Sequence, residues 1–303
     1  MAAIVPPEKL AIIKAQADFW AHSMRSPIVR TPEEYGLKYE DISFPSYDQV
    51  ALKGWFFPCE GSNKLIICNH PMPMNRYGYP GHLDEFKQLC DFEVNFLPEY
   101  KVLHDAGYNV LCYDQRNHGE SEEGDGGVAG AGRHEWKDSV GVKRWVDKHP
   151  VYSKMTLGLM SRCMGANAQF EAISRYPELF DNVKCIVAPQ PVTARYPAEA
   201  FCAQLGILDE IDVLEEEIRK LGGWTTTEMG PKPFVPKVHI PTLISQVHDD
   251  TWTKPEDVET IFELLGAEQK KLFWIEGTTR RFDGYNYFGE HPEEMLAWYA
   301  KYM

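Results

Sequence analysis

The chain has 303 residues, of which 44% are hydrophobic, and its formal net charge at pH 7 is −14. This length suits one large α/β unit with an excursion, or two small domains. The acidic charge argues against a nucleic-acid partner and against binding to an anionic membrane surface. No apolar run approaches the ~20 residues of a membrane span.

The cysteine content indicates the redox setting. Seven cysteines are present, an odd number without the spacing of a disulfide framework, which favours free thiols in a reducing compartment. No zinc-ligand spacing is present, so no metal is expected. Residues 1–8 lack a basic start followed by an apolar run, so no secretory signal is expected and we predict a cytoplasmic protein.

The first predicted element is an amphipathic helix over residues 8–24, within an N-terminal helical arm at residues 1–35. The sequence leaves open whether this helix packs on the body, covers a pocket or meets a second subunit in a homodimer. Residues 39–44 and 50–57 are rich in β formers and are separated by a short turn. They predict two antiparallel strands at a sheet edge.

Two more strands and two helical regions follow. Residues 64–69 predict a buried strand, which leads into a loop beginning H-P-M at residues 70–72. Residues 82–106 are predicted to be mainly helical, with an interruption at residues 97–98. Residues 108–113 predict a strand, which is followed by the run D-Q-R-N-H-G-E-S, and residues 135–148 predict a helix.

The clearest motif lies in residues 154–170, where an apolar strand is followed by helix formers, with S-R-C-M-G at residues 161–165 between them. This small-x-nucleophile-x-small pattern is typical of the nucleophile elbow, a sharp strand-to-helix turn. The strained turn crowds the positions two before and two after the nucleophile. Ser161 and Gly165 fill these positions, so the nucleophile position holds Cys163. An unreactive buried cysteine is the alternative interpretation.

The last third of the chain alternates again after an interruption. Residues 183–188 predict a strand, and residues 191–238 contain two helical stretches followed by several prolines, which we interpret as a lid or an independent helical hairpin. Residues 242–247 predict a strand that ends near Asp249 and Asp250. Residues 272–275 predict the last strand and residues 291–302 the last helix. Strands alternating with helices imply a mostly parallel sheet.

The order of these features resembles the α/β-hydrolase superfamily, in a variant with cysteine at the elbow as in dienelactone hydrolases. The resemblance covers roughly residues 39–303, and the run at residues 114–121 is similar to a turn of that superfamily. It implies an α/β-hydrolase fold, a mostly parallel sheet of about eight strands flanked by helices. The expected core comprises residues 36–190 and 239–303, with a small helical lid at residues 191–238.

The resemblance also implies site residues. Cys163 would be the nucleophile, and Asp250, favoured over Asp249 by spacing, would be the acid of a triad. The backbone N–H groups of Met72 and Met164 would form the oxyanion hole. Residue 71 is a proline and therefore has no N–H to donate.

The base of the triad is where the sequence departs from the superfamily. Arg280 stands at the position expected for the histidine. His291 is the next histidine, and a longer loop could bring it to Cys163, so His291 is the expected base. The alternatives are that His291 only begins the last helix, and that the base is His70 or His248.

A cysteine tolerates a missing base better than a serine does. A helix N-terminus and a nearby cation such as Arg162 can stabilise a thiolate, whereas a serine hydroxyl needs a base. Hydrolysis is harder in that case because water must still be activated. Non-hydrolytic chemistry is therefore a serious alternative.

The expected function is a cysteine-dependent acyl hydrolase or acyl transferase acting on an ester, lactone or thioester, without a cofactor. A resemblance in overall texture to hydrolase-like enzymes of fungal secondary-metabolite pathways implies a medium-sized apolar substrate, polyketide-like or fatty-acyl. The expected substrate-binding residues are His70, Trp252, Arg280, Tyr285 and Tyr287. The alternatives are a hydrolase-like isomerase, cyclase or lyase, and a non-catalytic ligand-binding protein.

Overall fold

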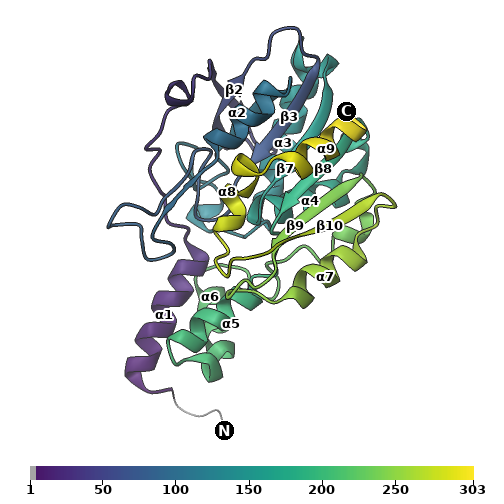
Figure 1. Ribbon diagram of the computed structural model, residues 1–303. Coiled ribbons are helices and arrows are strands. Elements are labelled where there is room, and N and C mark those ends of the chain that lie inside the picture. The colour runs from purple at the N-terminus through teal and green to yellow at the C-terminus, as the bar shows by residue number, and fades with distance from the viewer. Residues whose placement is uncertain (1–4) are drawn as a thin grey trace.

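A computed structural model describes residues 5–303. Residues 1–4, which belong to the stretch expected to lack a secretory signal, lie outside the described residues. Figure 1 shows a twisted sheet between two layers of helices, with a helical extension at one end. The sheet has eight strands in the order β1-β2-β6-β3-β7-β8-β9-β10. Their bounds are Glu40–Pro45, Ala51–Phe57, Asn109–Tyr113, Lys64–Asn69, Thr156–Ser161, Val183–Pro189, Thr242–Val247 and Lys270–Ile275.

The pairing of the strands matches the predicted sheet. β1 and β2 pair antiparallel at one edge, and β2 also pairs antiparallel with β6. The other five pairings are parallel. β9 is buried along its whole length and β3 nearly so, as expected for parallel strands covered on both faces. The chain therefore has the predicted fold class, a mostly parallel α/β sheet.

Helices cover both faces of the sheet, and each layer closes a separate core. One core contains side chains of α3, α4 and α7, and the other contains side chains of α2, α8 and α9. Alternate residues of β3 point to opposite cores, since Ile67 belongs to the first and Ile66 to the second. The helices are Trp136–Lys148 (α3), Met164–Arg175 (α4), Pro255–Leu264 (α7), Leu97–Asp105 (α2), Asp283–Glu290 (α8) and Glu293–Tyr302 (α9). Within residues 5–303 no helix is both long and apolar enough to cross a membrane.

The N-terminal helix α1 (Pro7–Ala21) packs with α5 (Arg195–Gln204) and α6 (Ile211–Lys220), two helices of the predicted lid. Figure 1 shows these three helices together at one end of the molecule. They share a third buried cluster, in which Ile13 and Ala17 meet Leu214 and Ile218. The arm is therefore part of the covering layer, which answers one question that the sequence left open.

Two segments differ from the sequence-based prediction. Residues 82–96 are not helical: they contain turns and the short strand β5 (Glu93–Asn95), which pairs with β4 (Gly78–Pro80). Pro98 lies in the first turn of α2 and does not interrupt a helix, because proline is well tolerated where N–H groups have no partner. Residues 283–290, predicted as part of a loop, form α8.

The packing of α1 predicts that alanine substitutions of two neighbouring isoleucines reduce the local stability by different amounts. Ile13 is fully buried, whereas Ile12 is 37% exposed. We expect Ile13→Ala to cost about 2–3 kcal/mol of local stability, because it deletes buried methylene groups and leaves a cavity. Ile12→Ala should cost less than about 0.5 kcal/mol. Hydrogen exchange of the α1 amides measures both, and equal effects would contradict this packing.

Candidate active site

Cys163 lies in a sharp turn between β7 and α4. Its backbone has φ +48° and ψ −112°, a sparsely populated conformation that costs about 1–3 kcal/mol and recurs at functional sites. The Cys163 N–H donates to the carbonyl of Pro189 at 2.9 Å, and its own carbonyl accepts from the Asn167 N–H at 3.0 Å. The turn therefore has the nucleophile-elbow geometry, with the thiol at the N-terminus of α4.

Gly165 allows this turn to approach β3. A Cβ atom on Gly165 would lie 2.2 Å from Oδ1 of Asn69 and 3.0 Å from the backbone oxygen of His70. The Nδ2 of Asn69 also donates to the carbonyl of Gly165 at 3.1 Å. These contacts explain why the position two after the cysteine must be glycine.

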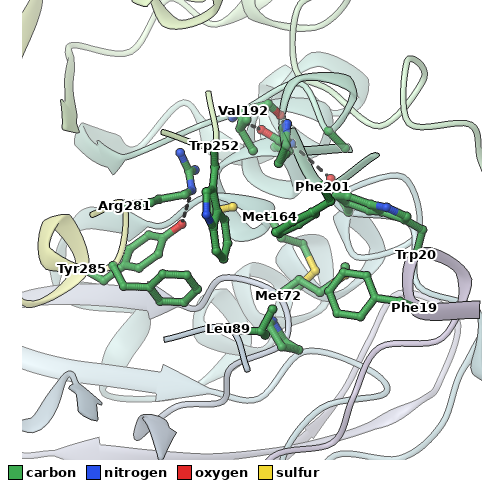
Figure 2. Close-up of a pocket in the computed structure, with 17 residues that line it drawn as sticks. Phe19, Trp20, Met72, Leu89, Met164, Val192, Phe201, Trp252, Arg281 and Tyr285 are labelled. Atoms are coloured by element: carbon green, nitrogen blue, oxygen red, sulfur yellow. Dashed lines mark hydrogen bonds between the residues drawn. The ribbon is translucent and has the colours of Figure 1, made fainter. Parts of the chain in front are cut away.

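Cys163 lines a pocket, which Figure 2 shows. Its volume is about 70 Å³, measured as the space that the centre of a water molecule can reach. Polar groups are few on its wall: besides Cys163 they come from Asn167, Arg281 and Tyr285. Most of the wall is apolar and includes Phe19 and Trp20 from α1 and Phe201 from α5, with further contacts from Met72, Leu89, Met164, Val192, Trp252 and Phe282. The covering helices therefore form one side of the pocket.

Arg281, the residue after Arg280, contacts Asp250, the predicted acid. Its Nη1 donates to Oδ2 of Asp250 at 2.9 Å, its Nη2 to the carbonyl of Gln190 at 2.7 Å, and its Nε to the hydroxyl of Tyr285 at 3.1 Å. Burial alone would lower the pKa of Arg281, but Tyr285, Cys163 and Asp250 outweigh it and hold the pKa well above its usual value. Arg281 is therefore a permanent cation beside the thiol.

Asp250 is buried and its carboxylate is fully engaged. Besides Arg281 it accepts hydrogen bonds from the Trp252 N–H at 2.8 Å, the Thr253 hydroxyl at 2.8 Å and the Gln246 amide at 3.2 Å. Asp249, the alternative acid, is exposed and bonds to His248. The structure thus places Asp250 at the site and Asp249 outside it.

Tyr285 lines the pocket together with Cys163 and Arg281. Burial raises the pKa of its hydroxyl well above the usual value, although Arg281 lowers it. The hydroxyl accepts a hydrogen bond from Nε of Arg281 at 3.1 Å and keeps its own proton. Tyr285 is thus a neutral hydrogen-bond donor on the pocket wall.

His291 does not line the pocket that contains Cys163, so the structure gives no support to the prediction of His291 as the base. His291 is exposed at the C-terminal end of α8, and its ring lies 4.9 Å from that of Tyr287. The extra residues before it form a helix that carries the imidazole to the surface. Tyr287 packs on Phe273 at a ring separation of 5.7 Å and does not line the pocket, contrary to the expectation for it.

Three further expected residues lie elsewhere. His70 is fully buried: its Nδ1 donates to the Pro71 carbonyl and its Nε2 accepts from the Gln115 N–H, each at 2.9 Å. It therefore has no nitrogen left for a substrate or for use as a base. Arg280 has a 60% exposed side chain paired with Asp283, one residue away from the pocket-lining arginine. His248 is also exposed and bonds to Asp249.

Arg162 is not the cation that stabilises the thiolate. It is fully buried, forms an ion pair with Glu99, and lies 4.2 Å from the ring of Phe96. Successive residues of an extended strand end point to opposite sides, so Arg162 contributes to the α2 side of the sheet. Arg281, and not Arg162, is the arginine that lines the pocket with Cys163.

Besides Cys163, four of the expected residues line the pocket: Met72, Met164, Trp252 and Tyr285. The backbone N–H groups of Met72 and Met164 have no hydrogen-bond acceptor within residues 5–303. Over the same residues no group of three His, Cys, Asp or Glu side chains could hold a metal ion.

Sequence reasoning missed Arg281 and the aromatic residues of α1. A helical spacing was present in the sequence, because Arg281, Tyr285 and Phe288 lie four and three residues apart, as side chains on one helix face do. Reading residues 282–288 as a loop hid this pattern. Phe19 and Trp20 carried no distinguishing signal, since apolar residues on a helix face usually only pack.

Comparison with known proteins gives the fold a name. No known protein-family profile matches this chain. An uncharacterised Bacillus subtilis protein, YqkD, is 23% identical over 230 residues, which cover 72% of this chain and 66% of that protein. The chain thus spans slightly less than two thirds of the length of this bacterial relative.

Solved structures match over most of the chain. An esterase of Pyrococcus furiosus, Pf2001, has a TM-score of 0.70 at 19% identity and covers 94% of this chain and 98% of its own. GrgF, an α/β hydrolase from Penicillium sp. sh18, has a TM-score of 0.59 at 18% identity, covering 88% and 97%. DcsB, in complex with its substrate analogue, has a TM-score of 0.60 at 16% identity, covering 87% and 98%. Together with the sheet and its helices, these matches show the α/β-hydrolase fold.

The buried ion pair predicts that glutamine substitutions of two neighbouring arginines lower the unfolding free energy by different amounts. Arg281→Gln removes the partner of a buried carboxylate and should cost about 3 kcal/mol of unfolding free energy at pH 7. Arg280→Gln removes an exposed pair with Asp283 and should cost at most about 1 kcal/mol. Urea denaturation compares the two variants with the unsubstituted protein. Equal costs would contradict a structural role for the Arg281–Asp250 pair.

Proposed function

We propose that the protein is an acyl-transferring enzyme in which Cys163 attacks the carbonyl carbon of an ester, lactone or thioester. The acyl group then passes to a nucleophile other than water. The observation that carries this proposal is the replacement of the base by Arg281, beside a cysteine in a strained elbow. A permanently charged arginine cannot accept a proton and therefore gives no help in activating water.

The first half-reaction uses groups already in position. The N-terminus of α4 and the guanidinium of Arg281 present positive charge to the pocket that the sulfur of Cys163 lines. When its sulfur bonds to the carbonyl carbon, the oxygen becomes an oxyanion, which the N–H groups of Met72 and Met164 would bind. One such donor is typically worth about 10²–10³ in rate. The bond to the leaving alcohol or thiol then breaks, and the leaving group takes up the proton lost by Cys163.

The second half-reaction is where hydrolysis and transfer differ. Water must lose a proton to attack a thioester efficiently, and within residues 5–303 no histidine lines the pocket. Arg281 stays charged, Tyr285 keeps its proton, and Asp250 is occupied by four donors. An amine or thiol needs less help than water, because each is a stronger nucleophile. A nucleophile within the acyl group itself would give a ring.

Hydrolysis is the second candidate, and the esterases among the similar structures favour it. In that reaction the same acyl-enzyme would form, and water would release it. The two candidates therefore share the role of Cys163 and differ only in the release step. A medium-sized polyketide-like or fatty-acyl substrate would place only part of its length in the pocket, since 70 Å³ corresponds to about five water positions.

Dependence on an acceptor tests the proposal. With a short-chain thioester as donor, we expect slow release in water alone, and turnover that rises at least about 10-fold with added cysteamine or another small thiol or amine. The measurement is the rate of appearance of the acyl-acceptor product. Cys163→Ala is the control and should abolish it. Rapid release of free acid that is independent of the acceptor and absent in Cys163→Ala would favour hydrolysis instead.

A serine variant tests the absence of a working base. We expect Cys163→Ser to lose at least about 10³-fold in acylation rate, because no group in the pocket can deprotonate its hydroxyl. His291→Ala should keep a near-normal rate, since His291 lies on the surface. Single-turnover kinetics with the same thioester measure both. A serine variant that retains substantial activity, together with an impaired His291→Ala, would restore the triad assignment.

A further inference from the structure

A second cavity adjoins the pocket on its outer side. Its volume is about 330 Å³ by the same measure, and it shares Phe19, Leu89 and Phe201 with the pocket. Figure 2 shows Phe19 and Phe201 on the same side of the pocket as Trp20, a residue of α1. The rings of Phe19 and Phe201 are 6.3 Å apart and meet edge to face. They line both the pocket at Cys163, here called the inner chamber, and the second cavity, here called the outer groove.

The chemistry of the outer groove differs from that of the chamber. Besides the three shared residues it is lined by Leu205 and by three glutamines, Gln16, Gln88 and Gln204. The glutamines come from α1, from the segment before β5 and from α5, so three separate elements bring carboxamides to one groove. None of the residues that line it is charged.

The carboxamides of these glutamines are free to bind a ligand. None of the three takes part in a side-chain hydrogen bond within residues 5–303, and Gln88 and Gln204 are exposed. Each offers two donors and one acceptor. Such groups match the amide bonds of an extended uncharged chain, and they offer no ion pair to a carboxylate or phosphate.

We propose, resting on the acyl transfer above, that the outer groove binds an uncharged arm carrying amide bonds, and that this arm belongs to the leaving thiol of a thioester. The acyl group stays on Cys163 after the first half-reaction, so the part that departs must be the part nearest to solvent. The thiolate of Cys163 forms a bond to the acyl carbon, the bond from that carbon to the arm's sulfur breaks, and the arm leaves as a thiol with the proton lost by Cys163. The small chamber then holds a short acyl group.

A pair of thioesters with the same propionyl group tests this proposal. We expect the pantetheine thioester to acylate Cys163 with a second-order rate constant at least about 10-fold above that of the ethyl thioester, which lacks the arm. Adding a phosphate to pantetheine should bring no further gain, since the groove is uncharged. In the triple variant Gln16→Leu/Gln88→Leu/Gln204→Leu the pantetheine and ethyl thioesters should react at similar rates. Gln269→Leu, at an exposed site just before β10 and outside the groove, is the control and should keep the preference.

Equal rates for the two thioesters in the unsubstituted protein would overturn the proposal, and so would a preference that survives in the triple variant. Calorimetry with pantetheine and the Cys163→Ala protein separates this inference from the proposed function. If pantetheine binds and the triple variant loses this binding, the proposed role of the groove is supported. If in addition no thioester acylates Cys163, only the proposed acyl transfer is wrong. If pantetheine does not bind but acylation is normal, only the proposed role of the groove is wrong.

Discussion

The candidate site depends on the buried ion pair between Arg281 and Asp250. A buried charge is costly unless it is paired and hydrogen-bonded, and here both partners have further hydrogen bonds. The planar guanidinium has five donors, so one side chain can hold Asp250, the Gln190 carbonyl and the Tyr285 hydroxyl together. An imidazole in this place would have two nitrogens and would titrate near neutral pH. Arg281 therefore gives the site a fixed cation that does not move protons.

A cysteine at the elbow is consistent with a neighbouring arginine. A serine next to Arg281 would keep its proton, because an arginine cannot accept one, whereas a thiolate is stabilised by a neighbouring positive charge. The helices α1 and α5 then cover the pocket with apolar side chains, and α6 packs behind them. In the proposed reaction Cys163, Arg281 and this apolar cover would act together, and exclusion of water would strengthen the charge interactions inside the pocket.

Much of this arrangement could be predicted from the sequence, and the reasons for the failures are local. Period-2 and apolar runs predicted the strands, and the steric demand of the elbow, met by Gly165, identified Cys163. The sequence did not reveal α8, because Gly284 and Asn286 have low helix propensity. The glycine at position 284 is required by packing, since a Cβ atom there would lie only 2.8 Å from the side chain of Gln190. Once residues 283–290 are helical, Arg281 and not Arg280 faces the pocket, and His291 moves to the surface. Packing of α1 over the site depends on tertiary contacts that no local pattern encodes.

Intact mass spectrometry during reaction with a short-chain thioester, with no added acceptor, tests the central claim most directly. If Arg281 leaves water unactivated, one acyl group should accumulate on nearly every protein molecule, map to Cys163 by peptide analysis and persist after the free donor is removed. Free enzyme as the main species, while the carboxylic acid is released rapidly and only when Cys163 is present, would contradict the claim.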